Sequence, residues 1–375
     1  MDPHFSHIGE PPNKKLRIGM VVPHSCVRTH KQAWLLLKRG HEVHLITERP
    51  MNEHGWQDYS ACHLFHSGHL TGNQPDPTGL MRTLASLRGV FDVLHISNEP
   101  DWPVYVARQA LPEVPIVWDI HDMVSQRTHE IDAWEIKAGE HADAFIVPSG
   151  IYKDIMGKRF PEKTVMEVQS AVPLDLYPKF RRTPQRHGLV YEGGLKGKKE
   201  GFSDQFEFRN WAQVFREVSK MNIEVWAYPA GAAEDLREYE KSGVIVMPAL
   251  PYHHLLNNLT SHEVGLVGSP FPTGAFDGAL PNKLFEYIAA GLPVICYNAP
   301  TAAMFVEGLG FGKGITSLEE IPDALEYFEK EKTADYVWSM RPYHCGERQV
   351  QKVERALESA ITRRTAITKN LEIQP

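Results

Sequence analysis

Short apolar runs alternate with amphipathic stretches along most of this chain. Near its start, an aliphatic run (LRIGMVV, 16–22) is followed by a loop, a stretch with helical periodicity (THKQAWLLLKR) and a second apolar run (HEVHLIT). Gly40 lies where a helix would end on a residue with positive φ. We therefore predict a β-α-β unit between residues 15 and 47.

The same alternation continues to about residue 170. Strands alternating with helices are typical of a parallel sheet that helices cover on both faces. The further runs expected to form strands are VLHIS (93–97), PIVWDI (115–120), AFIVPS (144–149) and TVMEV (164–168).

The alternation stops at VPLDLYPKFRRTPQRHG (172–188), which is rich in proline and charge and indicates an interdomain linker. The pattern then restarts, and a last helix is expected from about residue 347 to 365. Between them we predict strands at GLVYEGG, IEVWAYP, VIVMP, EVGLVGSP and PVICYN, and a helix at FEFRNWAQVFREVSKM.

These patterns predict an α/β fold with two doubly wound, Rossmann-like domains. Ligands of such sheets bind beyond the carboxyl ends of the strands, so two facing domains would form a central cleft. The expected parts are a disordered lead (1–14), a first domain (15–172), a linker (173–187), a second domain (188–345), and a C-terminal helix and tail (346–375) that packs back towards the first domain.

Composition narrows the class of protein. A hydrophobic content of 42% is that of a soluble globular protein, and a net charge of −7 does not favour nucleic acid or an anionic membrane surface. No apolar run approaches the roughly 18 residues of a membrane span. The 4 cysteines are scattered without a CxxC pair. This usage suits a reducing compartment and predicts a cytoplasmic protein without disulfide or metal staples.

The stretch LPNKLFEYIAAGLPVICYN carries one acid within a short apolar helix. Pro281 suits the first helical position and Gly291 the position just past the end. The helical period places Lys283, Glu286 and Tyr287 away from the buried face. The helix N-terminus could bind a phosphate, and a carboxylate one turn further could accept from a ribose diol. The alternative is an exposed ion pair between Lys283 and Glu286.

A glycine- and lysine-rich loop, LVYEGGLKGKK, follows a predicted strand. Gly193 and Gly194 would let backbone N–H groups approach an anion, and Lys196, Lys198 and Lys199 would supply charge. The loop lacks the spacing of a Walker A motif. Its lysines could equally be solvated surface charges.

The run WDIHDM ends a predicted strand in His121 and Asp122. Such a pair could contact a substrate hydroxyl or relay a proton, although a single histidine is more often structural. Another segment, which looks like an irregular insertion, holds Cys62, His63, His66 and His69. A metal site is disfavoured there, because the spacings of these residues fit no common zinc pattern.

Taken in order, the strand-HD element, the linker, YEGGL, the lysine-rich loop and PNKLFEYIAAGLPVI resemble the retaining glycosyltransferases of the GT-B fold, in particular glycosyltransferase family four. The resemblance runs from about Lys15 to the last helix. PNKLFEYIAAGLPVI is its most specific part.

The resemblance implies a transferase of the EC 2.4 class that moves a sugar from a nucleoside diphosphate sugar, UDP- or GDP-linked, to an acceptor hydroxyl. Such enzymes act with retention, usually without metal or other cofactor, by front-face attack in which the leaving phosphate takes the acceptor proton. Glu286 would hold the ribose and His121, with Asp122, would act at the donor sugar. The residues assigned to donor binding are Gly193, Gly194, Lys196, Lys198, Thr273, Gly274, Asn282, Lys283 and Glu286.

Three positions depart from the family pattern. Gly278 stands where many relatives carry a second glutamate, and Gly194 stands where many carry an arginine. The turn PHSCVRTH after the first strand contains no glycine. The donor contacts and the acceptor side are therefore the least determined parts of the prediction.

Other classes of protein remain as alternatives. A nucleotide-sugar epimerase would share the architecture but not the FEYIAAGLPVI segment, and a NAD-dependent dehydrogenase would need GxGxxG after its first strand. A catalytically inactive relative could act as a binding protein. The acceptor is expected to be a small molecule, a glycan or a protein. A modified DNA base would need a positive groove, for which the lysine-rich loop and Arg181, Arg182 and Arg186 are the candidates.

Overall fold

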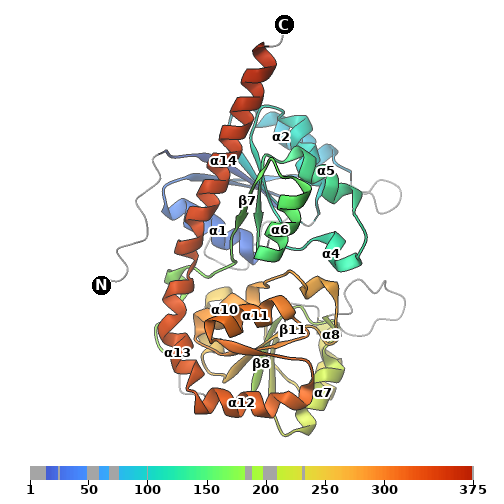
Figure 1. Cartoon of the computed structure of the whole chain (residues 1–375), viewed down its shortest axis with the longest axis vertical. Coiled ribbons are helices and arrows are strands. Elements are labelled where there is room, and N and C mark those ends of the chain that lie inside the picture. The colour runs from blue at the N-terminus through green and yellow to red at the C-terminus, as the bar shows by residue number, and fades with distance from the viewer. Residues whose placement is uncertain are drawn as a thin grey trace. The chain divides into compact units, whose positions relative to one another are not determined.

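The computed structural model describes residues 14–23, 26–48, 59–66, 76–98, 100–181, 188–196, 209–229 and 233–373 (Figure 1). The predicted lead, except for Lys14, and the later part of the linker (182–187) lie outside these residues. The chain divides into two compact units, one of Met1–Ser170 with Gly346–Pro375 and one of Ala171–Cys345. Each unit is built on its own parallel sheet.

The first unit has a seven-stranded parallel sheet among its described residues, in the order β3-β2-β1-β4-β5-β6-β7. The strands are β1 Arg17–Val21, β2 Glu42–Thr47, β3 Ala61–Leu64, β4 Val93–Ser97, β5 Ile116–Asp119, β6 Ala144–Val147 and β7 Thr164–Glu167. The helices are α1 Val27–Lys38, α2 Thr78–Ser86, α3 Trp102–Ala110, α4 Val124–Thr128, α5 Ala133–His141, α6 Gly150–Arg159 and α14 Gly346–Ile373.

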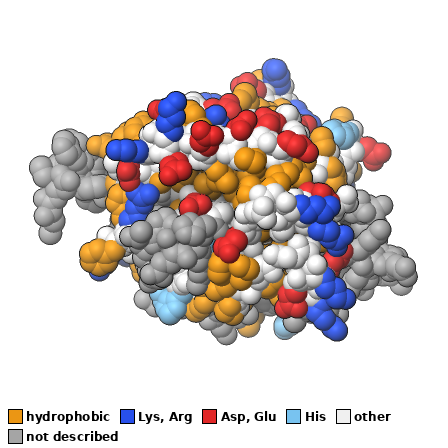
Figure 2. Space-filling model, turned by 90° about the horizontal axis from the view of Figure 1, so that it is seen from below, with side chains coloured by type: hydrophobic (Ala, Val, Ile, Leu, Met, Phe, Trp, Pro, Cys, Tyr) orange, Lys and Arg blue, Asp and Glu red, His pale blue; other side chains and the backbone are white. Residues whose placement is uncertain are grey.

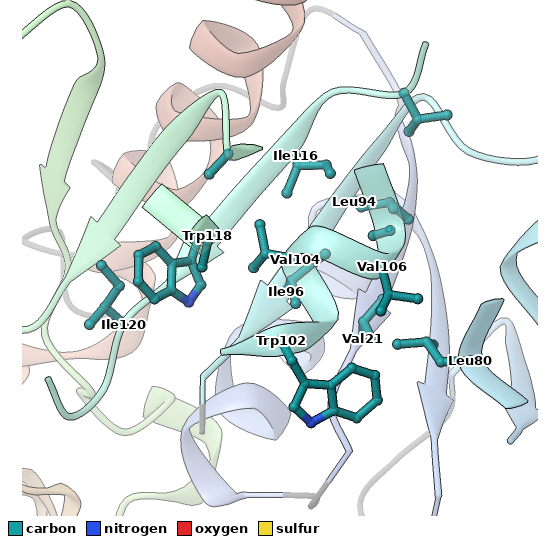
Figure 3. Close-up of a cluster of buried hydrophobic side chains, with 14 of the residues drawn as sticks. Val21, Leu80, Leu94, Ile96, Trp102, Val104, Val106, Ile116, Trp118 and Ile120 are labelled. Carbon is teal, nitrogen blue, oxygen red and sulfur yellow. The ribbon is translucent and has the colours of Figure 1, made fainter. Parts of the chain in front are cut away.

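The central strands β4, β5 and β6 are buried on both faces, so their side chains alternate between two apolar cores. In β5, Ile116 and Trp118 enter one core and Val117 enters the other. The first core, seen in Figure 3, also contains Val104 of α3 and Leu80 of α2. This arrangement explains why the central strands are continuous apolar runs in the sequence.

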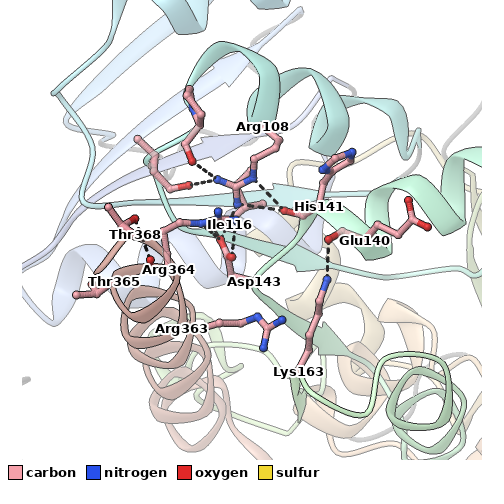
Figure 4. Close-up of polar contacts among 12 residues, drawn as sticks. Arg108, Ile116, Glu140, His141, Asp143, Lys163, Arg363, Arg364, Thr365 and Thr368 are labelled. Carbon is pink, nitrogen blue, oxygen red and sulfur yellow. Dashed lines mark hydrogen bonds and ion pairs between the residues drawn. The ribbon is translucent and has the colours of Figure 1, made fainter. Parts of the chain in front are cut away.

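The last helix, α14, belongs to the first unit although it follows the second unit in the sequence. Polar contacts fix it to the sheet around Asp143, whose side chain is 1% exposed (Figure 4). Arg108 Nη2 lies 2.6 Å from Asp143 Oδ2, and Arg364 Nη2 of α14 lies 2.7 Å from Oδ1. The predicted packing of the C-terminal helix against the first domain is confirmed.

The second unit has a six-stranded parallel sheet in its described part, ordered β10-β9-β8-β11-β12-β13. The strands are β8 Leu189–Gly193, β9 Val225–Pro229, β10 Ile245–Val246, β11 Val264–Gly268, β12 Val294–Tyr297 and β13 Gly312–Ile315. The helices are α7 Ala212–Lys220, α8 Ala233–Lys241, α9 Tyr252–Leu259, α10 Asn282–Ala290, α11 Pro300–Leu309, α12 Ile321–Lys330 and α13 Thr333–Met340.

Two Rossmann-like parallel sheets are therefore confirmed. Four element predictions need correction. Cys62 and His63 lie in an edge strand, β3, and not in an irregular insertion, and β13 was not predicted. Helix α7 begins at Ala212, where the side chain of Asn210 accepts a hydrogen bond from the Ala212 N–H, and α14 runs past the predicted residue 365 to Ile373. Among the described residues, no helix is both long and apolar enough to cross a membrane.

Candidate active site

In the second unit, the carboxyl end of β8 meets the first turn of α10. Gly193 ends β8 with φ +115°, and a Cβ on it would lie 3.2 Å from Lys283 Nζ. The same ammonium lies 3.6 Å from the centroid of the Tyr191 ring, which is cation–π distance. Two of the predicted donor residues, Gly193 and Lys283, are thus adjacent.

Glu286 is buried, with 3% of its surface exposed, and its Oε1 accepts a hydrogen bond of 2.9 Å from the Tyr252 hydroxyl at the start of α9. The alternative of an exposed ion pair with Lys283 is therefore wrong. Burying a carboxylate is costly unless hydrogen bonds satisfy it. A buried carboxylate one turn inside a helix that begins at a strand-end cluster is a candidate for binding a polar ligand group.

The prediction that Glu286 and Tyr287 lie away from the buried face of α10 is also wrong, because α10 is buried from Leu284 to Ala290. Tyr287 packs inward, where its hydroxyl donates to the Val190 carbonyl at 3.1 Å and accepts from the Glu192 N–H at 2.9 Å. Arg341 covers the C-terminal end of the helix by donating to the Ala289 carbonyl at 2.8 Å.

Helix α10 ends as the sequence predicts but begins one residue later than predicted. Pro281 is the N-cap, with extended backbone, so the first helical residue is Asn282. Gly291 is the left-handed C-cap at φ 77°, as predicted. Asn282 therefore stands at the helix terminus, where the N–H groups lack carbonyl partners within the helix.

Glu192 is a second buried acid beside this site, and the sequence interpretation missed it. It is 6% exposed and follows Tyr191, which enters the core of the second unit. Burial and the charges of Glu286 and Glu192 hold the pKa of Tyr252 well above its usual value. Tyr252 thus stays a neutral donor between two carboxylates. The alternation of side chains along β8 was the signal that could have placed Glu192 away from the core.

Arg209 supplies a cation next to Gly194, where the family pattern would have an arginine. A Cβ on Gly194 would lie 3.4 Å from Arg209 Nη1. The segment is held in place because the Lys196 N–H donates to the Arg209 carbonyl at 3.1 Å and Tyr239 donates to the Lys196 carbonyl at 2.7 Å. Lys198 and Lys199 lie outside the described residues.

Thr273 and Gly274 follow β11 at the same carboxyl edge of the sheet. The Thr273 hydroxyl accepts a hydrogen bond of 3.4 Å from the Ala275 N–H and so opens a short 3-10 turn at Gly274–Phe276. Thr301 of α11 holds this turn by donating to the Asp277 carbonyl. The predicted donor residues in the described part of the second unit thus lie at the end of β8, in the segments that follow β8 and β11, and in the first turns of α10. We call this set the strand-end cluster.

In the first unit, His121 follows β5 and faces a carboxylate and a thiol. Its Nε2 lies 3.4 Å from Asp119 Oδ2, and its Nδ1 lies 3.7 Å from Cys26 Sγ. Cys26 directly precedes α1, in the turn where the family pattern would have glycine. These residues, Cys26, His121 and Asp119, form what we call the thiol–imidazole cluster.

Asp119 is fully buried and fixed from several sides. Arg28 Nη2 lies 3.0 Å from its Oδ1, Gln32 Nε2 donates to its Oδ2 at 2.9 Å, and His95 Nε2 lies 3.4 Å from Oδ2. Burial alone would raise the pKa of this carboxyl, but the charges of Arg28 and His121 hold it well below its ordinary value. Asp119 is therefore an anion that orients the His121 ring.

His121 is cationic at neutral pH. Burial would lower its pKa, but the charges of Cys26 and Asp119 raise it to about 10. The side chain is still 17% exposed. A partly exposed imidazolium can contact a substrate and stabilise a developing negative charge.

The charge of the neighbouring Asp122 acts on Tyr152. Its charge, after burial, is the largest contribution that raises the pKa of Tyr152. Its backbone carbonyl accepts from Asn98, whose side-chain oxygen also accepts from the His121 N–H at 2.6 Å. The carboxylate that faces His121 is thus Asp119. Asp119 and His121 are two residues apart, and side chains at this spacing in an extended chain lie on the same face. This spacing was the signal in the sequence that could have identified Asp119 as the partner of His121.

No group of three or more possible metal ligands occurs within the described residues. His63 pairs with His44, its Nε2 lying 3.1 Å from His44 Nδ1, and His69 lies outside the described ranges.

Family models match the chain in two successive segments. The model described as Glycosyltransferase Family 4 matches residues 27–176, and the model described as Glucosyltransferase 3-like, C-terminal domain, matches residues 207–360. No curated protein sequence matches the chain.

Solved structures share the architecture at low sequence identity. Sucrose-phosphate synthase from Thermosynechococcus elongatus is 12% identical, with a TM-score of 0.63 over 96% of this chain and 100% of its own. WaaG, a glycosyltransferase involved in lipopolysaccharide biosynthesis, is 11% identical, with a TM-score of 0.62 over 91% and 99%. An α-glucosyltransferase in complex with UDP and a 13-mer DNA containing a HMU base is 12% identical, with a TM-score of 0.59 over 94% and 100%.

At these identities the likeness to solved structures shows the fold, and the two family models supply the activity class. Together, they show that this chain belongs to the glycosyltransferases of the GT-B type, which are transferases of the EC 2.4 class.

Proposed function

We propose that the protein transfers a sugar from a UDP- or GDP-linked donor to an acceptor hydroxyl, with retention of anomeric configuration and without a metal ion. The observation that carries the proposal is Glu286, a buried carboxylate on α10 that Tyr252 holds one turn beyond Lys283. Carboxylates placed in this way accept hydrogen bonds from vicinal hydroxyls, as a ribose would present.

The strand-end cluster offers matching groups for the rest of a nucleoside diphosphate. Lys283 and the start of α10 would meet the phosphates, together with Lys196 and Arg209 beside the glycines of β8. Arg209 thus takes the part that an arginine at position 194 would have had. We also assign Thr273, Gly274 and Asn282 to donor binding, and Lys198 stays a prediction of the sequence.

Metal independence is proposed because the strand-end cluster can itself offset the charge of a leaving diphosphate. Two side-chain cations, Lys283 and Arg209, lie next to the end of β8, and the α10 terminus adds partial positive charge. Such fixed groups stabilise the charge that develops as the glycosidic bond to phosphate breaks. Activity should accordingly survive treatment with a chelator.

In the proposed reaction, the bond between the anomeric carbon and the phosphate oxygen breaks while the acceptor oxygen bonds to the same face of the sugar. The acceptor proton passes to the leaving phosphate oxygen. We propose that the exposed part of the His121 imidazolium contacts the donor sugar, with Asp119 fixing the ring. The anomeric configuration of the product, read by NMR, tests retention directly.

For the acceptor, we propose a neutral small molecule, a glycan or a protein. The net charge is −7, and acidic and basic side chains are interspersed over the face shown in Figure 2. Neither property favours a polyanion, such as DNA, as the acceptor. We also propose a cytoplasmic location, because the 4 scattered cysteines of the sequence suit a reducing compartment.

A thermal-shift screen against UDP, GDP, ADP, CDP, TDP and their sugars would identify the donor, because a ligand that binds the native state raises the melting temperature. Glu286→Gln keeps the size of the side chain but removes the charge that favours hydroxyl donors. We expect it to raise the Kd of the identified nucleotide at least about tenfold, or about 1.4 kcal/mol.

The matched control is Glu326→Gln, which changes an exposed glutamate on α12 and should leave the Kd unchanged. If Glu286→Gln binds the nucleotide as tightly as the control variant, the ribose assignment is wrong. If none of the nucleotides shifts the melting temperature, the donor proposal itself fails.

A further inference from the structure

Cys26 occupies an unusual position for a cysteine in this chain. It is partly exposed, directly precedes the 12-residue helix α1, and its Sγ lies 3.2 Å from Thr29 Oγ1 and 3.7 Å from His121 Nδ1. The other ring nitrogen of His121 faces Asp119 at 3.4 Å. The thiol–imidazole cluster therefore joins the start of α1 to the end of β5, as a relay from thiol to imidazole to carboxylate.

This relay is rigid at its buried end. Asp119 is fixed by Arg28 and Gln32, so it cannot turn away from His121. A carboxylate that orients an imidazole, which in turn contacts a thiol, is the arrangement that activates nucleophilic cysteines. A helix N-terminus next to the sulfur favours the thiolate further.

The ionisation of the thiol agrees with this geometry. Burial alone would raise the pKa of Cys26, but the charge of His121, its hydrogen bond and contacts with Thr29 lower it to about 7. Because the pKa of His121 is raised to about 10, thiolate and imidazolium coexist between about pH 7 and 10.

The other groups that face Cys26 from neighbouring elements do not oppose a thiolate. Tyr59, which precedes β3, stays neutral because burial and the charges of Cys26 and Cys62 raise its pKa. Its hydroxyl lies 2.5 Å from His30 Nδ1. Thr29 is hydrogen-bonded to Ser97 of β4 at 2.9 Å. Of the titratable side chains described around the sulfur, His121 is thus the one whose charge acts on it most strongly.

The remaining cysteines provide internal comparisons. Cys62 is exposed on β3, and burial raises its pKa. Cys296 is buried in β12, where burial raises its pKa strongly, and Cys345 is also buried. Reactivity of a cysteine requires both thiolate character and access. Cys26 combines the two.

We propose that Cys26 is a reactive thiolate site, activated by His121 and Asp119, that small alkylating electrophiles and hydroperoxides modify selectively. The inference rests on the contacts within the first unit and does not depend on the proposed donor or acceptor.

With a hydroperoxide, the thiolate sulfur attacks one peroxide oxygen, the S–O bond forms and the O–O bond breaks. The departing hydroxide or alkoxide takes the proton of the His121 imidazolium and leaves as water or alcohol. Sulfur is oxidised by two electrons to a sulfenic acid and the peroxide is reduced by the same two electrons. The balance needs no group beyond the hydroperoxide.

The test is the rate of iodoacetamide alkylation at each cysteine of the full chain, followed by peptide mass spectrometry between pH 5.5 and 9.5. We expect the Cys26 rate to reach half its maximum near pH 7, and at pH 7 to exceed the Cys62 rate at least about tenfold. A Cys26 midpoint as high as that of an ordinary thiol, about 8.5, would overturn the proposal.

Two variants assign the cause. His121→Gln should lower the Cys26 rate at pH 7 about tenfold or more and shift its midpoint upward, because the neighbouring cation is lost. Cys62→Ser should leave the Cys26 profile unchanged. An unchanged profile in His121→Gln would contradict the relay, and the wild-type profile tests the site even if that variant does not fold.

Oxidation is read separately by trapping with dimedone after brief exposure to hydrogen peroxide. We expect the adduct at Cys26 before any at Cys62. An adduct that forms first at Cys62, or none at Cys26, would remove hydroperoxides from the proposal.

Discussion

At the scale of single residues, the contacts of Asp119 connect much of the first unit's chemistry. It is the anion for Arg28, which is 3% exposed, and for His121, which is also the partner of Cys26. Removing one partner of a buried ion pair leaves the other charge without compensation. Asp119 should therefore matter for stability as well as for the orientation of His121.

We expect Asp119→Asn to lower the free energy of unfolding of the first unit by about 3–5 kcal/mol at pH 7. The asparagine keeps the shape of the side chain but cannot balance the charge of Arg28. Chemical denaturation followed by fluorescence would measure the loss. Asp154→Asn, at an exposed position of α6, is the control and should change stability by no more than about 0.5 kcal/mol.

The pH dependence of this difference has a definite sign. Because the pKa of Asp119 is held well below its ordinary value in the folded protein, its contribution is fully present above about pH 4. It is lost as the pH falls through the folded-state pKa. The stability gap between wild type and Asp119→Asn should therefore shrink in acid. A gap that widens below pH 4 would show that Asp119 is not the ionised partner.

Residue-level prediction from the sequence was most specific where a side chain lies inside a distinctive motif. Glu286 and Lys283 could be singled out because PNKLFEYIAAGLPVI predicts a helix with defined ends. Asp119 was not predicted because the sequence motif pairs His121 with Asp122. Arg209 was not predicted because it is close to Gly194 in the fold but distant from it in the sequence. Contacts of that kind are set by tertiary structure and leave no local pattern.

At the scale of elements, the second unit's candidate site depends on how closely the end of β8 approaches α10. Gly193 allows this approach for two reasons. Its φ of +115° is a conformation that residues with a side chain rarely adopt, and a Cβ would lie 3.2 Å from Lys283 Nζ and 3.5 Å from Cε. The glycine thus sets the position of the lysine relative to the strand end.

Gly193→Ala is expected to strain the backbone by about 1–3 kcal/mol and to displace Lys283. The melting temperature should fall, and the Kd for the identified nucleoside diphosphate should rise about tenfold, which calorimetry would measure. Gly308→Ala in α11 is the matched control, because no atom lies within 4 Å of its added Cβ. That change should leave binding unchanged and stability equal or slightly higher. If Gly193→Ala binds the nucleotide as tightly as the wild type, the end of β8 is not part of the donor site.

Elements were predicted well where apolar runs are continuous and poorly where they are short or polar. Central strands such as β4, VLHIS, match the sequence prediction residue for residue. The edge strand β3, ACHL, alternates between half-buried and exposed positions, and β13, GKGI, has two glycines and a lysine. Residues of these types have low strand propensity, and pairing with β2 and β12 decides their structure. For helix α10 the sequence prediction underestimated burial, because it expected one buried face and the structure covers both faces.

At the scale of the whole molecule, the chain leaves the first unit after Ser170 and returns to it at Gly346. The returning helix α14 places Val350, Val353, Ala356, Leu357 and Ala360 in an apolar core with β1, β5 and β6 of the first unit. Arg364 adds an ion pair to the buried Asp143 (Figure 4). The first unit is therefore completed by residues that follow the whole second unit in the chain.

If α14 is part of this core, then Leu357→Ala should destabilise the first unit even though residue 357 follows the whole of the second. Leu357 is fully buried, and deleting a buried leucine side chain costs about 2–5 kcal/mol. Arg355→Ala, an exposed position two residues earlier on the same helix, should change stability by less than about 0.5 kcal/mol.

Calorimetry would measure the loss of stability in Leu357→Ala, and hydrogen exchange would locate it. Faster exchange should appear in β4 to β7, with β8 to β13 keeping their protection, because the lost contacts belong to the core of the first unit. Faster exchange confined to the second unit, or a Leu357→Ala variant as stable as Arg355→Ala, would refute the assignment of α14 to the first unit.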